Sequence, residues 1–421
     1  MNILDAIYGR TTFDASFSKL AASPVVQRLR HVRLSNIESL DAPGAANISR
    51  YEHVIGVAYL ATQVGFWRKM SQRDRKLLQA SAMLHDWAIT SFGHLVEEAL
   101  QYVGTGFHHE ARLNEILAGE AEEIGGIERQ ILVGRATGLR EWAISEIGHE
   151  GTPAFLKDLT DTIQGRGPIG PVIAGSVDLD NIDNVCRMAF HMGLDVDKAL
   201  PVQLAKSMLG VQNGHILFDI TAEQHLSTWV DLRSEVYSHL MMAPDDFIGK
   251  VMLLNSAITA FEHNEFGVSD WSWTDHQFLG ALLSSPTPIV KETAERWLSG
   301  ELWACTPMWW FEGPRPPYVK LREFSRVLSE RIGRDCLAYA IKDKRHRSIE
   351  AYFSNGSIKT LGSKPNQWLL GVGSPLRRDF TNVENHQIQS ISAQFFDTRL
   401  AMQPPISVWS TPRAAGQGSL F

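Results

Sequence analysis

The stretch ASAMLHDWAITSFGH, residues 80–94, runs from an apolar segment into the adjacent pair His85 and Asp86 and then reaches a further histidine, His94. Apolar residues in 75–87 recur at the spacing of one helix face, so we predict a helix that ends at the pair. A single histidine on a helix is more often a hydrogen-bonded core residue than a ligand. The pair therefore indicates a functional site only if other residues of the chain support it.

The same helical spacing extends over most of the sequence and predicts an all-α region from about residue 18 to 300. It is clearest in segments 54–67, 75–87, 94–103, 182–193 and 245–261. After 311–318 the pattern changes, because residues 347–362 hold two alternating runs around Asn355-Gly356, a strong hairpin signal. We therefore predict a mainly α protein, with a helical bundle at 1–300 and a smaller α+β domain at 301–421 that ends in an irregular tail.

Composition excludes several classes of protein. The 421 residues include 40 Lys and Arg against 47 Asp and Glu, and the net charge of −7 argues against a protein that coats nucleic acid. Three cysteines, at 186, 305 and 336, are too few and too scattered for a disulfide framework or a thiolate zinc site, which favours a reducing cytoplasm. No segment has the roughly 18 consecutive apolar residues of a membrane span, so we expect no membrane insertion.

Four residues are candidate metal ligands: His53, His85, Asp86 and Asp180. Each lies at or near an end of an apolar helical segment, so a helical bundle can direct all four toward one internal pocket. Imidazole and carboxylate together suit one divalent ion, and this ligand set does not distinguish Mn, Fe, Mg, Ni or Zn.

The order His…His-Asp…Asp resembles that of the HD superfamily of metal-dependent phosphohydrolases, and within it the deoxynucleoside triphosphate triphosphohydrolases. The likeness is carried by VVQRLRHVRLSNIESLDAPGAANISRYEHVIGVAYLA (25–61), LHDWAITSFGH (84–94), FHHE (107–110) and VDLDNIDNVCRMAFHMG (177–193), with weaker echoes at 232–240 and 269–279. It covers roughly residues 18–300. It implies an HD-domain helical bundle, one divalent ion on the four candidate ligands, and a homo-oligomer.

The resemblance also implies roles for residues around the metal. Arg50 matches a phosphate contact, His94 and His109 match donors to phosphate oxygens or to the leaving group, and Glu97 matches a catalytic carboxylate. Each has a simpler interpretation, such as a surface ion pair for Arg50 or a solvated carboxylate for Glu97. Because His94 and Glu97 are three residues apart, they share one helix face, which favours the functional interpretation.

Several positions depart from the family pattern. Ile89 replaces a catalytic histidine, which would leave Glu97 without a partner, and Asn181 and Asn184 replace the lysine and tyrosine that hold the triphosphate. Met188 replaces the aspartate that reads the sugar, while Trp229, upstream of the matching Tyr237, stands for an arginine. Each lost charged hydrogen bond weakens phosphate binding by roughly 1.5–3 kcal/mol. Either other residues replace these groups, or the substrate has fewer phosphates or another shape.

The sequence thus favours a metal-dependent phosphohydrolase that acts on a nucleotide or nucleotide-like phosphate, similar to the dNTP triphosphohydrolases but with altered specificity. Arg50, Asn181, Asn184 and Tyr237 are the candidate substrate-binding residues. Two alternatives remain open: a phosphodiesterase for cyclic or short oligonucleotides, and a catalytically weakened nucleotide sensor or assembly subunit. The basic run KDKRHR (342–347) is expected to be a solvated loop rather than a contact for nucleic acid or an anionic effector.

Overall fold

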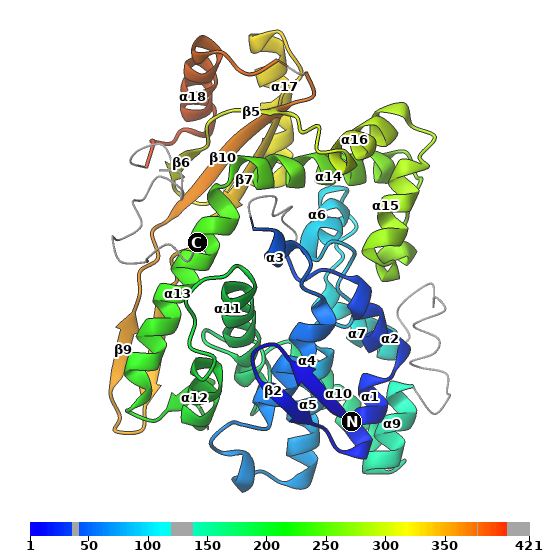
Figure 1. Ribbon diagram of the computed structural model, residues 1–421, viewed down its shortest axis with the longest axis vertical. Helices are drawn as coiled ribbons and strands as arrows, with labels where there is room; N and C mark the ends of the chain where they lie inside the picture. Colours follow the sequence, from blue (N-terminus) through cyan, green and yellow to red (C-terminus); the bar gives the residue numbers. More distant parts are fainter. Residues whose placement is uncertain (36–41, 119–137, 377, 402–421) are drawn as a thin grey trace, which may run out of the picture.

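The computed structural model describes residues 1–35, 42–118, 138–376 and 378–401. The expected irregular tail at 402–421 lies outside the described residues. Figure 1 shows the chain as a mainly helical protein, with strands along its left side and a separate hairpin near the N-terminus at the bottom. None of the described helices is both long and apolar enough to cross a membrane.

Helices make up most of the first 300 residues. They are α1 (Ala15–Ala21), α2 (Pro24–Arg28), α3 (Pro43–Ala46), α4 (Arg50–Ala61), α5 (Gln72–Leu84), α6 (His94–Tyr102), α7 (His109–Ala118), α9 (Leu139–Ile147), α10 (Thr152–Ile163), α11 (Leu179–His191), α12 (Leu200–Ser207), α13 (Ala222–Met242), α14 (Pro244–Glu262), α15 (Asp275–Leu283) and α16 (Pro288–Leu298). Helices α4, α5, α6, α11 and α14 confirm the five segments predicted from apolar spacing.

The helix α4 is the centre of the bundle and packs against both α5 and α11. Nine of its twelve residues are buried, because neighbouring helices cover it on several sides. Gly56 allows α11 to approach closely: a Cβ at this position would lie 2.2 Å from Arg187 Nη2 and 2.3 Å from Asp183 Oδ1. The charged residues of α11 thereby reach the face of α4 that carries His53.

The expectation of an all-α region from about residue 18 to 300 is wrong at one hairpin, and another hairpin precedes that region. Strands β1 (Asn2–Asp5) and β2 (Gly9–Thr12) pair at the N-terminus, and β3 (Met208–Gln212) pairs with β4 (His215–Phe218). The second turn holds Asn213 and Gly214 with φ of 52° and 78°, the backbone that an Asn-Gly hairpin turn requires.

The hairpin predicted around Asn355-Gly356 is confirmed by β8 (Ile349–Phe353) and β9 (Ile358–Leu361), which pair antiparallel. Strand β8 also pairs in parallel with β4, so one sheet of order β3-β4-β8-β9 joins segments from either side of residue 300. The fold is therefore mainly α with a smaller α+β part. The division at residue 300 stays a prediction, because this sheet takes strands from both proposed domains.

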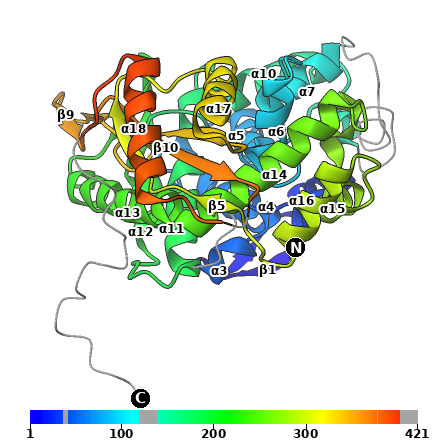
Figure 2. The same ribbon diagram turned by 90° about the horizontal axis from the view of Figure 1, so that it is seen from above.

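A second sheet is built around the long strand β10 (Gln367–Ser374), which pairs with β5 (Ala304–Cys305), β6 (Trp309–Glu312) and β7 (Leu337–Lys342). The helices α17 (Tyr318–Ile332) and α18 (Asn382–Phe396) pack on one face of it, where they enclose a small apolar core with Trp368 and Phe311. The opposite face, with Leu369 and Tyr339, joins the main core near α14 (Figure 2). The loop that follows β7 therefore lies next to the helical bundle.

Candidate metal centre and active site

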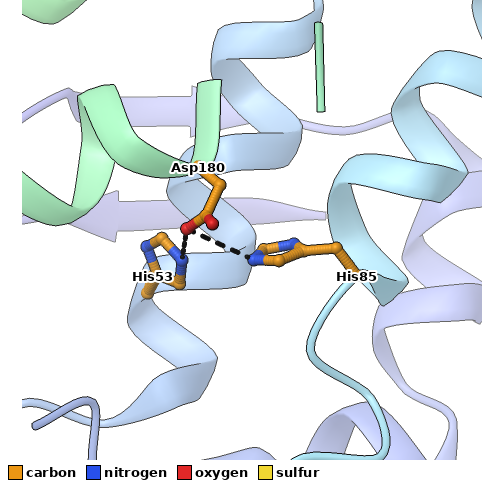
Figure 3. A group of neighbouring side chains, drawn as sticks. All are labelled: His53, His85 and Asp180. Carbon is orange, nitrogen blue, oxygen red and sulfur yellow. Dashed lines mark hydrogen bonds and ion pairs between the residues drawn. The ribbon is translucent and has the colours of Figure 1, made fainter. Parts of the chain in front are cut away.

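The four candidate ligands meet in the interior of the bundle. His53 lies on α4, His85 is the residue that ends α5, Asp86 follows it, and Asp180 lies in the first turn of α11. Figure 3 shows His53, His85 and Asp180 converging from three segments. Ligand atoms of these three lie within 4.8 Å of one another, and Asp86 Oδ2 is 3.3 Å from His85 Nε2 and 3.8 Å from His53 Nε2.

Both imidazoles are held with the same nitrogen facing the centre. His53 Nδ1 donates to Asp183 Oδ2 at 2.7 Å, and His85 Nδ1 donates to the Ala82 carbonyl at 2.8 Å. An acceptor at Nδ1 fixes the tautomer in which Nε2 carries a free lone pair. The two Nε2 atoms face Asp180 Oδ1 at 2.9 Å and 3.6 Å.

The charges at this centre fit a divalent cation. Burial lowers the pKa of both imidazoles, but the carboxylates outweigh burial and raise the pKa of His53, and that of His85 more strongly. In the described part of the chain His85 Nε2 is buried without a hydrogen-bond partner. Imidazole lone pairs that face carboxylate oxygens need a positive charge between them. A metal ion that takes nitrogen and oxygen ligands would provide it.

The orientation of His53 depends on a buried ion cluster behind it. Asp183 is fully buried and accepts from His53, from Arg187 at 2.9 Å and from the Tyr8 hydroxyl at 2.6 Å. Arg187 is also buried and contacts the carboxylates of Asp5 and Glu52 as well. The pKa of the Asp183 carboxyl is held at about 2, because the Arg187 charge and the His53 hydrogen bond outweigh burial. Asp183 thus remains an acceptor for His53 Nδ1 and fixes its tautomer.

The loop after Asp86 is anchored to a distant segment. The guanidinium of Arg28 is buried and donates to the carbonyls of Ile89 at 2.6 Å and Trp271 at 3.1 Å. Asp275 accepts from the backbone N–H of Phe92 at 2.6 Å. These bonds fix the path of residues 87–93, which determines where α6 begins.

At the start of α6 the backbone has a conformation that favours glycine. Gly93 has φ of 61° and ψ of −126°, and a Cβ there would lie 3.0 Å from Arg50 Nη2. The Thr90 hydroxyl donates to the Gly93 carbonyl at 2.6 Å and accepts from Glu97 N at 3.0 Å. This turn places His94 beside the candidate metal centre.

His94, Glu97 and His109 form a second cluster next to the ligands. The carboxylate of Glu97 accepts from His94 Nδ1 at 2.9 Å and from His109 Nδ1 at 3.0 Å. His109 Nε2 lies 3.6 Å from Asp86 Oδ1, so this imidazole bridges Glu97 and a candidate ligand. Burial lowers the pKa of His109, but both carboxylates act against it and raise the pKa to about 9. The expectation that Glu97 lacks a partner is wrong, because two histidines bind it.

Ile89, which stands at the position of the missing family histidine, is buried in the interior of the protein. Its side chain has 0% exposure and belongs to the main hydrophobic core, while its carbonyl is bound by Arg28.

The candidate substrate-binding residues lie in different surroundings. Arg50, Asn184 and Tyr237 line a cavity of about 120 Å³ next to the centre. Arg50 Nη1 is committed to Asp86 at 2.7 Å, and Asn181 is held by Asp178 and by Arg347 Nη1 at 2.9 Å.

A larger cavity, of about 700 Å³, lies on the other side of His94. His94 and Lys344 line both cavities, whereas Glu97 and His109 line only the larger one. The substrate-binding roles of the residues named above stay predictions.

The residues that hold the site in place were not predicted from the sequence. Asp183 had a usable signal, because it follows Asp180 by three residues and precedes Arg187 by four, on one face of a helix. Arg28 lies within the segment that carried the family resemblance. Tyr8 gave no signal, since 175 residues separate it from Asp183.

Comparisons with known proteins agree with this architecture. No protein-family model matches the chain. An uncharacterized protein of Methanocaldococcus jannaschii is 22% identical over 298 residues, which cover 70% of this chain and 57% of that protein. A deoxynucleoside triphosphate triphosphohydrolase SAMHD1 homolog of Dictyostelium discoideum is 25% identical over 210 residues, 45% of this chain and 36% of that protein. The matched part therefore spans less than two thirds of either relative.

Among solved structures, a phosphohydrolase from Bacteroides thetaiotaomicron superposes over 89% of this chain and 100% of its own, with a TM-score of 0.64 and 16% identity. At this identity the likeness concerns the fold. Together with the SAMHD1 homolog, it confirms that the chain resembles the HD-type, dNTP triphosphohydrolase-like phosphohydrolases.

Proposed function

We propose that this protein is a divalent-metal-dependent phosphohydrolase that acts on a nucleotide or a nucleotide-like phosphate. The observation that carries the proposal is the convergence of two imidazole Nε2 atoms and two carboxylates beside the His94–Glu97–His109 cluster. The names of the SAMHD1 homolog and of the phosphohydrolase with the same fold support the reaction class. The metal-ligand roles of His53, His85, Asp86 and Asp180 belong to this proposal.

A bound divalent ion would polarise a phosphoryl oxygen and lower the pKa of bound water. The protein's own residues supply the remaining functions. His109, between Asp86 and Glu97, holds a proton at Nε2 beside the centre, and Glu97 keeps its imidazole oriented. The His94 side chain is 46% exposed and lines both cavities, so it can pass a proton to a leaving group that departs toward solvent.

The nucleotide and the cellular compartment are parts of the same proposal. The cavities that meet at His94 have room for an organic group on one side of the centre and a short polar group on the other. Cys186, Cys305 and Cys336 are all free thiols, which supports the cytoplasm as the compartment. The expected homo-oligomer stays a prediction.

The test combines metal analysis with a product screen over nucleotides. Metal-loaded protein should hydrolyse at least one nucleoside phosphate, and the products distinguish release of inorganic triphosphate from cleavage of a phosphodiester. His94→Ala and His109→Ala should each lower turnover by about 10²–10⁴, the usual effect of losing a general acid or base.

His386→Ala is the matched control, because His386 is an exposed histidine on α18 that lines neither cavity. It should keep near wild-type turnover. Wild-type rates in His94→Ala and His109→Ala, with metal content unchanged, would refute the proposed roles. An absence of metal binding in the wild type would refute the function as a whole.

A further inference from the structure

Most cations around the centre are already neutralised by carboxylates. Arg50 donates to Asp86 at 2.7 Å, and Lys250 lies 3.2 Å from Glu98. Arg187 is enclosed by three carboxylates. None of these three cations can bind an anionic substrate at full strength without giving up a partner.

Two nearby arginines, Arg233 and Arg347, are not paired with a carboxylate in the described structure. Arg233 on α13 is 8% exposed, its Nε and Nη1 have no hydrogen-bond partner among the described residues, and its Cζ lies 4.3 Å from the centre of the Tyr237 ring. Arg347 donates to two neutral oxygens, Asn181 Oδ1 at 2.9 Å and the Gly175 carbonyl at 2.8 Å. A buried guanidinium with unused donors is costly unless an anion binds it.

Asp178 and Asp180 do not neutralise Arg347 directly. Their charges favour the protonated guanidinium through space, while burial and the charge of Arg233 lower its pKa. Across the described residues neither carboxylate forms an ion pair with it. Asp178 is instead occupied by the backbone N–H groups of Gly175 and Asn181, both at 2.7 Å. Arg233 and Arg347 thus leave positive charge beside the helix that carries Asp180.

The basic run 342–347 adds a third cation near the centre. Within this run, some side chains are paired with the carboxylate of Asp343 and others are not. Asp343 accepts from His346 at 2.9 Å and from Arg345 at 3.3 Å, so these two charges are used locally. Lys344 is exposed, and in the described structure no hydrogen bond or ion pair reaches its ammonium. It lines both cavities at the centre, together with His94. The run is a loop in which Lys344 is exposed, as expected, but the expectation of a solvated loop is wrong for Arg347, which is half-buried and hydrogen-bonded to Asn181 and Gly175.

We propose that Lys344, Arg347 and Arg233 bind the phosphates of the substrate, and that the substrate carries a chain of at least two phosphates. One phosphate lies at the centre formed by His53, His85, Asp86 and Asp180, and the next is held by the three cations. This rests on the function proposed above. The positive charge absent from position 181 is supplied by a segment that contacts Asn181 from 166 residues further along the chain.

The test measures binding of inorganic tripolyphosphate to the full-length, metal-loaded protein by isothermal titration calorimetry, in excess Mg²⁺ so that the ligand does not extract the metal. Lys344→Ala and Arg347→Ala should each weaken binding by about 10- to 100-fold, the effect of losing one charged hydrogen bond. Lys342→Ala is the matched control, because it removes an exposed lysine from the same run and should bind as the wild type does. Orthophosphate should bind more weakly than tripolyphosphate.

Because Lys344 is exposed and unpaired in the described structure, its loss should leave folding intact, so a result with this variant is decisive even if Arg347→Ala is destabilised. Equal tripolyphosphate affinity in Lys344→Ala and the wild type would overturn the proposal, as would equal affinity of the wild type for orthophosphate and tripolyphosphate. If the wild type hydrolyses no nucleotide but binds tripolyphosphate through Lys344, the phosphate site stands and the proposed hydrolysis fails.

Discussion

Replacing Asp183 with asparagine tests whether the buried cluster behind His53 controls metal binding. The carboxylate accepts from His53 Nδ1 at 2.7 Å, from Arg187 at 2.9 Å and from Tyr8 at 2.6 Å. An asparagine of nearly the same size has one oxygen and one NH₂ group. In one orientation the NH₂ faces Arg187 Nη2 and the Tyr8 hydroxyl, and in the other it faces Arg187 Nε and His53 Nδ1. The second orientation moves the proton of His53 to Nε2, where it blocks the lone pair that faces Asp180.

The expected magnitude follows from these contacts. Loss of a carboxylate that orients a metal-binding histidine typically lowers metal affinity by about 10- to 100-fold. Arg187 also loses a charged hydrogen bond, which should lower the free energy of unfolding of the metal-free protein by about 1.5–3 kcal/mol. Because the second effect is independent of metal, the two can be measured separately.

The assay is metal titration by calorimetry with Mn²⁺, Ni²⁺ and Zn²⁺, together with urea unfolding of metal-free protein. Tyr8→Phe is the control, because it removes another hydrogen bond to Asp183 and leaves His53 untouched. It should change metal affinity by less than about 3-fold. The reasoning is refuted if Asp183→Asn binds metal as tightly as the wild type, or if Tyr8→Phe weakens binding equally.

Three further changes test other parts of the structure. Arg187→Met should lower the free energy of unfolding by about 3–5 kcal/mol in urea titrations, because it removes the buried guanidinium that pairs with three carboxylates. Arg326→Met, in an exposed pair, should change it by less than about 1 kcal/mol. Removing the divalent ion with a chelator should lower the Tm reversibly, since an ion at a hundred times its Kd stabilises the fold by about 2.7 kcal/mol; an equal response in Asp86→Ala would contradict a site at Asp86. Ile89→His should destabilise the protein by about 1–3 kcal/mol without raising turnover, because it buries an imidazole in the core, and faster triphosphate hydrolysis would contradict this.

The helical part of the fold and the candidate ligands were predictable because their signals are local. Apolar spacing predicted α4, α5, α6, α11 and α14, and the order of two histidines and two aspartates on helix ends predicted a common pocket. The hairpin β3–β4 was missed although Asn213-Gly214 carries the same dipeptide signal that was used at Asn355-Gly356. The two strands are short and lie between segments with helical apolar spacing, so the whole region was predicted to be helical.

What could not be predicted depends on residues that meet only in the folded chain. Position-by-position comparison identified Ile89 as a lost partner of Glu97, but His109 comes from the next helix and binds the same carboxylate. The comparison also identified Asn181 as a lost cation, and Arg347 contacts its amide oxygen from the C-terminal part. In both cases the sequence showed the loss, and only the fold shows the replacement.

The choice between a hydrolase and a nucleotide sensor depends on the His94–Glu97–His109 cluster. A sensor needs cations to bind phosphates, and Lys344 and Arg347 could meet that need without any proton-transfer groups. The structure also buries Glu97 and His109 beside Asp86, and burying a charged pair costs several kcal/mol before its mutual attraction is counted. Nucleotide binding alone gains nothing from that arrangement. Hydrolysis does, because the cluster connects the candidate metal centre through His109 and Glu97 to the half-exposed His94. From His94 a proton can be transferred to a leaving group. For this reason we favour hydrolysis.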